Sequence, residues 1–555
     1  MASLVPTVAD IEKRGAQLWP VLDDRQIARL ARFGAEEKLP AGTILWDEGQ
    51  VGVPFFVILE GEVEVVHPRG VLEEPITVHT PGQFSGEVTL LTMGRALVRG
   101  RAKTDVRVLR LAPAGLQNVI QTDSELSEIF MRAFILRRVG LILGHQGDAV
   151  VLGSQHSAQT LRLQAFLTRN GHPYRYVDVE REPDVQSMLD EFHVTVTDIP
   201  VLICRGDKVL KNPSNVEVAD CLGFNPTMDD AAVHDVVIVG AGPAGLAAAV
   251  YAASEGLDAL VVEAMAPGGQ AGSSSKIENY LGFPTGISGQ ALAHRALNQA
   301  EKFGARFAVA RTAVSLDCTG VPYVVQIEGG QNVRARAVVI ASGAEYRKLE
   351  IPDRERFEGV GVYYGATFIE AQRCGSDEVI VVGGGNSAGQ AAMFLSQTAR
   401  HVHVLIRGEN LAASMSRYLI RRIEESSNVT LRTRTRLVAF EGNDALESVT
   451  WLDERTGERE TRPIRHVFTM AGADPNTSWL QGCLRLDEKG FVLTGTDLKK
   501  SEGGPGAPRA PLQFETSLRN VFAVGDARAG SVKRVAASVG EGSACVQLIH
   551  KALAG

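Results

Sequence analysis

Residues 234–245 have the sequence HDVVIVGAGPAG, an apolar strand that leads into the glycine pattern Gly-x-Gly-x-x-Gly. Gly240 permits a tight turn, Gly242 lets the backbone approach a pyrophosphate, and Gly245 lets the following helix pack on the strand. The turn also contains Ala241, Pro243 and Ala244. The unsatisfied N–H groups and positive dipole end of the helix favour phosphate. This stretch therefore predicts a dinucleotide-binding α/β fold.

A second strand supports this prediction. The run LDALVVEA, residues 257–264, carries Glu263 at its end, at about the distance where an acid hydrogen-bonds a ribose diol. We therefore expect this fold to bind a dinucleotide through Glu263.

A second glycine-rich turn lies in VIVVGGGNSAGQAAMFLSQ, residues 379–397. Its pattern is Gly-x-Gly-x-x-Ala, formed by Gly383, Gly385 and Ala388, with Asn386 and Ser387 between them. The next strand, HVHVLIRG, carries Arg407 where an acid would repel a 2′-phosphate. An arginine there favours NADPH over NADH. The alternative is a solvated charge at the end of a strand, so NADH stays possible.

A late carboxylate occurs in RNVFAVGDARAGSVKRVAASVGEGSA, residues 519–544. A strand that ends in Gly525 and Asp526 would place this carboxylate as an acceptor for a flavin's ribityl chain. The helix that follows opens with Lys533, Arg534 and Val535. The dinucleotide fold that begins at 234 therefore closes at the far end of the chain, with the second one inserted in it.

The residues before 234 predict two further parts. Residues 40–112 alternate short apolar runs with Gly and Pro, which indicates a β-roll or barrel, and a helix is expected over 125–143. Residues 149–222 alternate strands and helices, which indicates a small α/β unit with a helix over 184–193 and one strand over 201–210. The stretch 222–233 is typical of a linker.

Composition excludes several classes of protein. The chain has 57 basic and 65 acidic residues, a net charge of -8, and so no basic footprint for nucleic acid or an anionic membrane. Charged residues appear early at the amino terminus, so we expect no export signal and a cytoplasmic protein. The uncharged run 236–253 contains Gly and Pro, which argues against a membrane span. The six cysteines form no CxxC pair and no metal-ligand spacing, so each is expected to be a small core residue and no metal site is predicted.

Residues 234–555 resemble the low-molecular-weight thioredoxin reductases. Besides the two turns, the matching pieces are Gly268-Gly269-Gln270, the run IENYLGFP with Asn279, the segment around Gly343, and GADPNT at 472–477. The resemblance implies FAD in the first fold, with Gly269, Gln270 and Asn279 among its ligands, and NADPH in the second. It also implies a rotation between the two folds and a homodimer.

The chain departs from that family at the redox centre. The two cysteine positions of the family's CxxC fall on Gly365 and Phe368, so no dithiol forms there and no catalytic side chain is predicted. Cys374 follows and is expected to be a buried thiol. Gly408 and Ala412 thin the family's arginine cluster for the 2′-phosphate.

The middle unit resembles a thioredoxin or glutaredoxin, with Ile199-Pro200 at the family's cis-proline. Its redox turn has Ser154, His156 and Ser157 instead of cysteines, so a docking or spacer module is favoured over a catalytic one.

The N-terminal roll resembles a cyclic nucleotide-binding domain. In FSGEVTLLTMGRALV the matching residues are Gly86, Glu87, Arg95 and Ala96. The glutamate would accept a hydrogen bond from a ribose hydroxyl, and the arginine would pair with the cyclic phosphate. Gly94 and Leu97 depart from the family pattern, so both a binding domain and a scaffold that has lost its ligand stay open.

We therefore predict a multidomain chain: a cyclic nucleotide-binding-like β-roll with flanking helices (1–142), a thioredoxin-like α/β unit (147–224), and an FAD-binding Rossmann-like fold (234–346 and 471–555) that contains an inserted NAD(P)H-binding one (347–470). Its expected activity is oxidation of NAD(P)H through FAD without a dithiol of its own, regulated through the N-terminal domain. The electron acceptor stays open: a small redox protein, a quinone, dioxygen or a partner's disulfide. The alternatives are a cyclic nucleotide or redox sensor with little turnover, and a scaffold that binds FAD only for stability.

Overall fold

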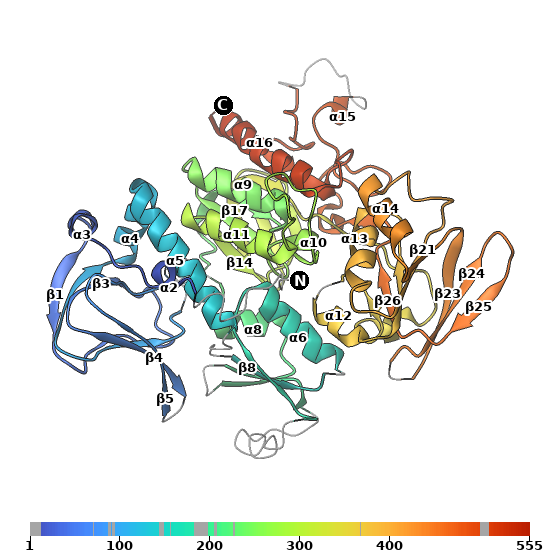
Figure 1. Cartoon of the computed structure of the whole chain (residues 1–555). Coiled ribbons are helices and arrows are strands. Elements are labelled where there is room, and N and C mark those ends of the chain that lie inside the picture. The colour runs from blue at the N-terminus through green and yellow to red at the C-terminus, as the bar shows by residue number, and fades with distance from the viewer. Residues whose placement is uncertain are drawn as a thin grey trace. The chain divides into compact units, whose positions relative to one another are not determined.

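The structure is a computed structural model of the chain (Figure 1). It describes residues 13–69, 72–86, 90, 95–143, 149–155, 157–181, 198–204, 208–225, 228–366, 368–443, 445–499 and 510–554. These form two compact units, the first holding most residues before 229 and the second most residues after it.

The first unit begins with a β-roll. Its strands are β1 (Ala35–Leu39), β2 (Ile44–Trp46), β3 (Phe55–Glu60), β4 (Val63–Arg69), β5 (Leu72–His79), β6 (Arg99–Ala102) and β7 (Val106–Leu111), in two sheets of order β1-β7-β3 and β2-β6-β4-β5. Its helices are α2 (Gly15–Leu18), α3 (Asp24–Leu30), α4 (Pro113–Thr122) and α5 (Ser124–Leu143). Phe55 and Phe84 of the roll pack on Phe130 and Phe134 of α5. The roll and the helix after it are therefore as predicted.

A small α/β sheet follows in the sequence. Its elements are β8 (Ala149–Gly153), α6 (Ala158–Arg169), β9 (Arg175–Asp178), β10 (Val201–Cys204), β11 (Lys208–Lys211) and α8 (Asn215–Leu222). The strand order is β11-β10-β8-β9, with β8 and β9 parallel and β10 antiparallel to both of its neighbours. The peptide bond Ile199-Pro200 is cis. The helix expected over 184–193 lies outside the described residues.

Two predictions for this part were wrong. The single strand over 201–210 is an antiparallel pair, β10 and β11, with Cys204 opposite Lys208. In the sequence, Gly206 and Asp207, which favour turns, interrupt the apolar run. Cys204 of β10 and Cys221 of α8, expected to be unpaired core residues, form a disulfide with a Cα–Cα distance of 6.6 Å.

The chain then forms a seven-stranded sheet of order β14-β13-β12-β17-β16-β15, with β28 paired to β17. Its strands are β12 (Val233–Val239), β13 (Ala259–Glu263), β14 (Arg306–Val309), β15 (Ala313–Asp317), β16 (Tyr323–Ile327), β17 (Asn332–Ile340) and β28 (Val521–Ala523). Its helices are α9 (Pro243–Ser254), α10 (Gly269–Gly272), α11 (Gly289–Lys302), the 3₁₀ turn η5 (Gly525–Ala527) and α16 (Val535–Ala554). Because β28 runs parallel to β17, the sheet that begins at 233 is completed near the end of the chain.

Between β17 and β28 lies a second parallel sheet, of order β19-β26-β20-β21-β22. Its elements are η3 (Arg354–Phe357), β19 (Val362–Tyr363), α12 (Phe368–Cys374), β20 (Glu378–Val382), α13 (Asn386–Leu395), β21 (His401–Leu405), α14 (Arg417–Glu425), β22 (Val429–Arg432) and β26 (His466–Thr469). An antiparallel sheet of β23 (Thr435–Glu441), β24 (Ser448–Asp453) and β25 (Arg459–Arg462) lies within this insertion. After β26 the chain forms η4 (Ser478–Leu480) and α15 (Thr496–Lys499).

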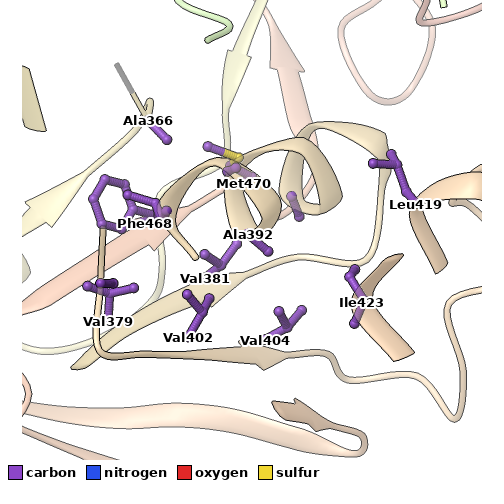
Figure 2. Packing of buried hydrophobic residues seen from close by; sticks show 14 of the residues in the cluster. Ala366, Val379, Val381, Ala392, Val402, Val404, Leu419, Ile423, Phe468 and Met470 are labelled. Carbon is purple, nitrogen blue, oxygen red and sulfur yellow. The ribbon is translucent and has the colours of Figure 1, made fainter. Parts of the chain in front are cut away.

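The core of the inserted sheet explains its strand pattern (Figure 2). Val379 and Val381 alternate along β20 toward one face, and Val402 and Val404 do so along β21, and all four are fully buried. They pack against α13 and α14, whose apolar positions include Ala392, Leu419 and Ile423. The helices α13 and α14 therefore cover this apolar face of the sheet.

A two-stranded ribbon joins the two sheets. β18 (Ala344–Tyr346) pairs antiparallel with β27 (Ala473–Pro475), and Arg347 forms an ion pair with Asp474 at 2.6 Å beside it. Both crossings between the sheets therefore pass through one hydrogen-bonded ribbon. Among the described residues, no helix is long and apolar enough to cross a membrane.

Candidate dinucleotide sites

The first glycine turn uses each glycine for a different reason. Gly240 has a φ of 103°, and a Cβ on it would lie 2.3 Å from the carbonyl oxygen of Ala341. A Cβ on Gly245 would lie 1.9 Å from the carbonyl oxygen of Gly240, so only glycine lets α9 pack there. A Cβ on Gly242 would meet nothing within 4 Å. The second glycine therefore faces the open space that a pyrophosphate needs.

Glu263 holds this turn in place. Its buried carboxylate accepts hydrogen bonds from the N–H groups of Ala241 (2.7 Å), Met265 (2.9 Å) and Ala266 (3.2 Å). A carboxylate oxygen accepts more than one hydrogen bond, so the same group can also receive a ribose hydroxyl. Glu263 thus lies against the turn, as its spacing predicts.

The segment 268–270 lies against the same turn. The N–H of Gly268 donates to the carbonyl oxygen of Ala241 at 2.7 Å, and a Cβ on Gly269 would lie 3.0 Å from the Cα of Gly242. The amide of Gln270 donates to the carbonyl oxygen of Ala344. The segment 268–270 and the first glycine turn, which are separate in the sequence, are therefore adjacent in the structure.

The late carboxylate also meets this site. Gly525, at a φ of 69°, lies so close to α9 that a Cβ on it would be 2.9 Å from the Cβ of Ala244. Next to it, Asp526 has a buried Oδ1 without a hydrogen-bond partner among the described residues. Burial raises the pKa of Asp526, Lys533 opposes this increase and Glu541 adds to it. A buried acceptor without a donor fits a ligand hydroxyl such as one on a ribityl chain.

Arg528 and Glu541 are site residues that the sequence did not reveal. Glu541 of α16 accepts from the N–H of Gly525 at 2.8 Å and pairs with Arg528 at 2.6 Å, and both side chains are largely buried. This pair fixes the loop that carries Asp526. No local sequence signal marks it, because the partners meet only when α16 packs on η5.

The other predicted residues around this site lie as follows. The Nζ of Lys533 donates to the carbonyl oxygen of Asp526 at 2.6 Å, and Val535 begins α16. Asn279 and Arg534 are exposed, and neither side chain has a hydrogen bond to the described residues. The structure therefore brings Lys533 to the site and leaves these two at its surface.

The second glycine turn repeats the first. Gly383 has a φ of 142°, and a Cβ on it would lie 2.5 Å from the carbonyl oxygen of Met470, whereas a Cβ on Gly385 would meet nothing within 4 Å. Ala388 is fully buried at the third position. Open space again lies over the second glycine, at the start of α13.

Side chains around this turn complete the site. The Oδ1 of Asn386 accepts from the N–H of Ser416 at 2.7 Å. Burial raises the pKa of Tyr346, and the hydrogen bond from Ser387 opposes this increase. Arg407 is exposed just beyond β21, and the described residues offer its guanidinium no ion pair.

Gly365 and Phe368, which occupy the two positions of the family's dithiol, lie just after β19 and at the start of α12. A Cβ on Gly365 would be 3.8 Å from the Cβ of Ser273, and Phe368 is the first residue of α12. Cys374 ends that helix, is buried as predicted, and donates to the carbonyl oxygen of Glu370 at 3.2 Å. Burial raises the pKa of the Cys374 thiol to about 12, so it is protonated and unreactive at neutral pH.

The N-terminal and middle candidates are described only in part. Gly86 has a φ of 103°, and the N–H of Ala96 donates to the carbonyl oxygen of Gln50 at 2.9 Å, next to Arg95. In the small α/β sheet the hydroxyl of Ser157 accepts from the N–H of Thr160 at 3.3 Å, and Ser154 donates to Glu180. Ser157 therefore caps α6. Glu87 and His156 lie outside the described residues.

Comparison with known proteins agrees with this geometry. Residues 234–542 match the family model "Pyridine nucleotide-disulphide oxidoreductase". The chain belongs to that family. Residues 36–123 match the family model "Cyclic nucleotide-binding domain".

Thioredoxin reductases are among the relatives of this family member. The enzyme of Bacillus subtilis is 32% identical over 323 residues, which are 58% of this chain and 96% of that protein. The enzyme of Mycolicibacterium smegmatis is 34% identical over 317 residues, 56% of this chain and 94% of that protein. A crystal structure of Lactococcus lactis thioredoxin reductase in its FR conformation matches with a TM-score of 0.52 and 27% identity, covering 58% of this chain and 99% of that one. The chain is therefore an NAD(P)H-dependent flavoprotein oxidoreductase of a family that uses FAD and NADPH.

Substitution by alanine should have different consequences at Gly242 and at Gly245 of the first turn. Gly242→Ala should leave the stability unchanged and weaken FAD binding about 10-fold or more, because the new methyl occupies only the pyrophosphate's space. Gly245→Ala should lower the free energy of unfolding by about 1–3 kcal/mol, because its methyl collides with the turn itself. Flavin content and thermal unfolding of the purified variants measure both effects. A Gly242→Ala protein with full flavin content would contradict the placement of the pyrophosphate.

Proposed function

We propose that the chain oxidises NAD(P)H through FAD and passes the electrons to a separate acceptor, because its NAD(P)H-binding fold has no dithiol. The observation that carries this proposal is the pair of turns in which Gly242 and Gly385 face open space while their neighbours are tightly packed. Two such turns in one unit support two dinucleotides.

The FAD site in this proposal is formed by residues from three separate segments. Glu263 would bind the ribose diol, the backbone from Gly240 to Gly245 the pyrophosphate, and Asp526 a ribityl hydroxyl. When bound, FAD supplies the flavin that accepts a hydride from the nicotinamide. The protein's own part is orientation: Glu541 and Arg528 hold the Asp526 loop, and Gln270 fixes the segment 268–270.

The NAD(P)H site is proposed at the N-terminus of α13. Gly383, Gly385 and Ala388 shape the turn, Asn386 and Ser387 begin the helix, and Arg407 would pair with a 2′-phosphate. NADPH is the expected donor on that ground.

Arg407→Ala should raise the apparent KM for NADPH about 10-fold or more and change that for NADH less than about twofold. The reason is the loss of charge-assisted hydrogen bonds, worth about 1.5–3 kcal/mol, to a phosphate that only NADPH carries. Arg400→Ala is the matched control. Arg400 lies just before the N-terminal end of β21, whereas Arg407 lies beyond its C-terminal end, and Arg400 forms an ion pair with Glu378 at 3.1 Å. Equal effects on both donors would show that Arg407 does not contact the 2′-phosphate.

The absence of cysteines at positions 365 and 368 sets the proposed output. No thiolate can form at Gly365 or Phe368, and the nearby Cys374 is buried, so the electrons leave by another route, such as a partner protein's disulfide. The deciding experiment is anaerobic reduction of the purified yellow protein by NADPH, followed by a screen of disulfide, quinone and oxygen acceptors. A flavin that NADPH does not bleach would refute the proposal and leave FAD a structural role.

The N-terminal domain supports a second, regulatory function. Its match to the cyclic nucleotide-binding family and the positive φ of Gly86 favour a bound nucleotide. We expect that nucleotide to modulate the activity of the flavin-binding and NAD(P)H-binding folds. Titration calorimetry with cAMP and cGMP, with bleaching rates measured in parallel, tests this function. No heat and an unchanged rate would assign the domain a scaffold role.

The small α/β unit fits a docking module in this proposal. Its strand order β11-β10-β8-β9 supports a thioredoxin-like fold, and a serine caps the helix where a redox cysteine would lie. The homodimer implied by the family resemblance stays a prediction.

A further inference from the structure

Two cysteines that lie far apart in the sequence meet on the flavin-binding fold. Cys318 follows directly after β15, and Cys483 follows η4. Their thiols interact with each other, and both side chains are partly exposed. No sequence motif marks this pair, because its members belong to segments on either side of the inserted fold.

Local hydrogen bonds hold both cysteines in position. The N–H of Cys483 donates to the carbonyl oxygen of Leu480 at 3.1 Å and so extends the η4 turn. On the other side, the carboxylate of Asp317 accepts from the N–H and the hydroxyl of Thr319 at 3.0 and 2.8 Å, which closes the turn around Cys318. Since β15 packs against η4, the turns that follow these two elements lie close to each other.

The other four cysteines differ in exposure. Cys374 and Cys545 are buried and unpaired, and Cys204 and Cys221 are buried in their own disulfide. Thiol–disulfide exchange requires access to the attacking sulfur. Among the described cysteines, Cys318 and Cys483 alone combine proximity with exposure.

The surroundings of the pair assign different roles to its two sulfurs. Burial raises the pKa of Cys483 to about 12, and the hydrogen bond and charge of Cys318, together with the Asp317 carboxylate, add to this increase. The raised pKa disfavours the Cys483 thiolate at neutral pH. Because the thiolate is the attacking species in exchange, we assign the first attack to Cys318.

We propose that Cys318 and Cys483 form a thiol–disulfide exchange site that reacts with disulfide substrates at the surface of the flavin-binding fold. The Cys318 thiolate attacks a substrate disulfide RSSR, which gives a mixed disulfide and releases RS⁻. The sulfur of Cys483, on losing its proton, attacks Cys318, closes the Cys318–Cys483 disulfide and displaces the second RS⁻. In total, two protein thiols are oxidised and one RSSR is reduced to two RSH. The site is independent of the two nucleotide turns and of what accepts electrons from the flavin.

The test uses the full chain, reduced and freed of reductant, with oxidised glutathione as the probe. After incubation, free thiols are alkylated under denaturing conditions and the peptides are mapped by mass. We expect a peptide crosslinked through Cys318 and Cys483, with Cys374 and Cys545 alkylated. Full alkylation of Cys318 and Cys483 would overturn the proposal.

Two serine variants separate the roles of the sulfurs. Cys483→Ser should accumulate a glutathione adduct on Cys318, because no second thiol displaces it. In Cys318→Ser, glutathionylation of Cys483 should be at least about tenfold slower than that of Cys318 in Cys483→Ser. Cys374→Ser is the matched control and should retain the crosslink. An adduct on Cys483 that forms at the rate expected for Cys318 would contradict the assigned order, and retained flavin absorbance verifies that each variant is folded.

Discussion

Substitution of valine for Gly385 should give a yellow protein that NADPH no longer bleaches. The backbone of Gly385, at φ -92° and ψ 178°, is extended and suits valine, and no atom lies within 4 Å of the position of its Cβ. The inserted fold therefore stays intact while the isopropyl group fills the space for the pyrophosphate. Loss of two or more charge-assisted hydrogen bonds of about 1.5–3 kcal/mol each lowers affinity about 100-fold or more.

Stopped-flow reduction under anaerobic conditions measures this effect, with flavin absorbance as the check on folding. Gly384→Ala is the matched control in the same turn, because its Cβ would make ordinary contacts at 3.5–3.8 Å with Ile406, Ser414 and Leu411. The control should bleach at nearly the parent's rate. If Gly385→Val also bleaches at that rate, NADPH binds elsewhere.

A double variant, Gly365→Cys with Phe368→Cys, should acquire NADPH-dependent reduction of a small-molecule disulfide. Position 365 accepts a side chain, because its Cβ would be in ordinary contact with Ser273, three residues beyond Gln270. Position 368 begins α12, so the two thiols would have the spacing of a CxxC at the start of a helix, where thiolates are favoured. The rate should exceed that of the parent at least about tenfold.

The single variants Gly365→Cys and Phe368→Cys are the controls. Each carries one thiol at this place and cannot close the intramolecular disulfide that a turnover requires. Equal rates for the double and the single variants would show that positions 365 and 368 do not lie where the family's dithiol lies. Reduction of the dye 5,5′-dithiobis(2-nitrobenzoic acid) is a suitable readout.

Much of the flavin-binding and NAD(P)H-binding architecture could be predicted because its requirements are local. Gly240 and Gly383 have a positive φ, and Gly245 packs closely on its own turn. Each of these requirements is therefore visible as a glycine within a motif of six residues. Asp526 was predictable for the same reason, as a polar residue after a short apolar strand.

The missed residues have partners that only tertiary packing supplies. Glu541 contacts Gly525 because α16 packs on η5. Cys318 interacts with Cys483 although the inserted fold separates them in the sequence. Cys204 and Cys221 meet because α8 folds back on β10. A periodic apolar pattern gives the face on which a residue lies and does not give the residue opposite it. The antiparallel pair of β10 and β11 was missed because two apolar runs so close together in the sequence resemble one strand.

The ribbon of β18 and β27 has a consequence for the order in which the chain folds during synthesis. It brings the two ends of the inserted fold together, so this fold can close on itself as soon as residue 475 has left the ribosome. The flavin-binding sheet, in contrast, waits for β28 and for the Asp526 loop, which are made later. Nascent chains stalled before residue 521 should therefore contain a protease-resistant inserted fold and hold no flavin, and FAD should be incorporated only at the last stage of translation.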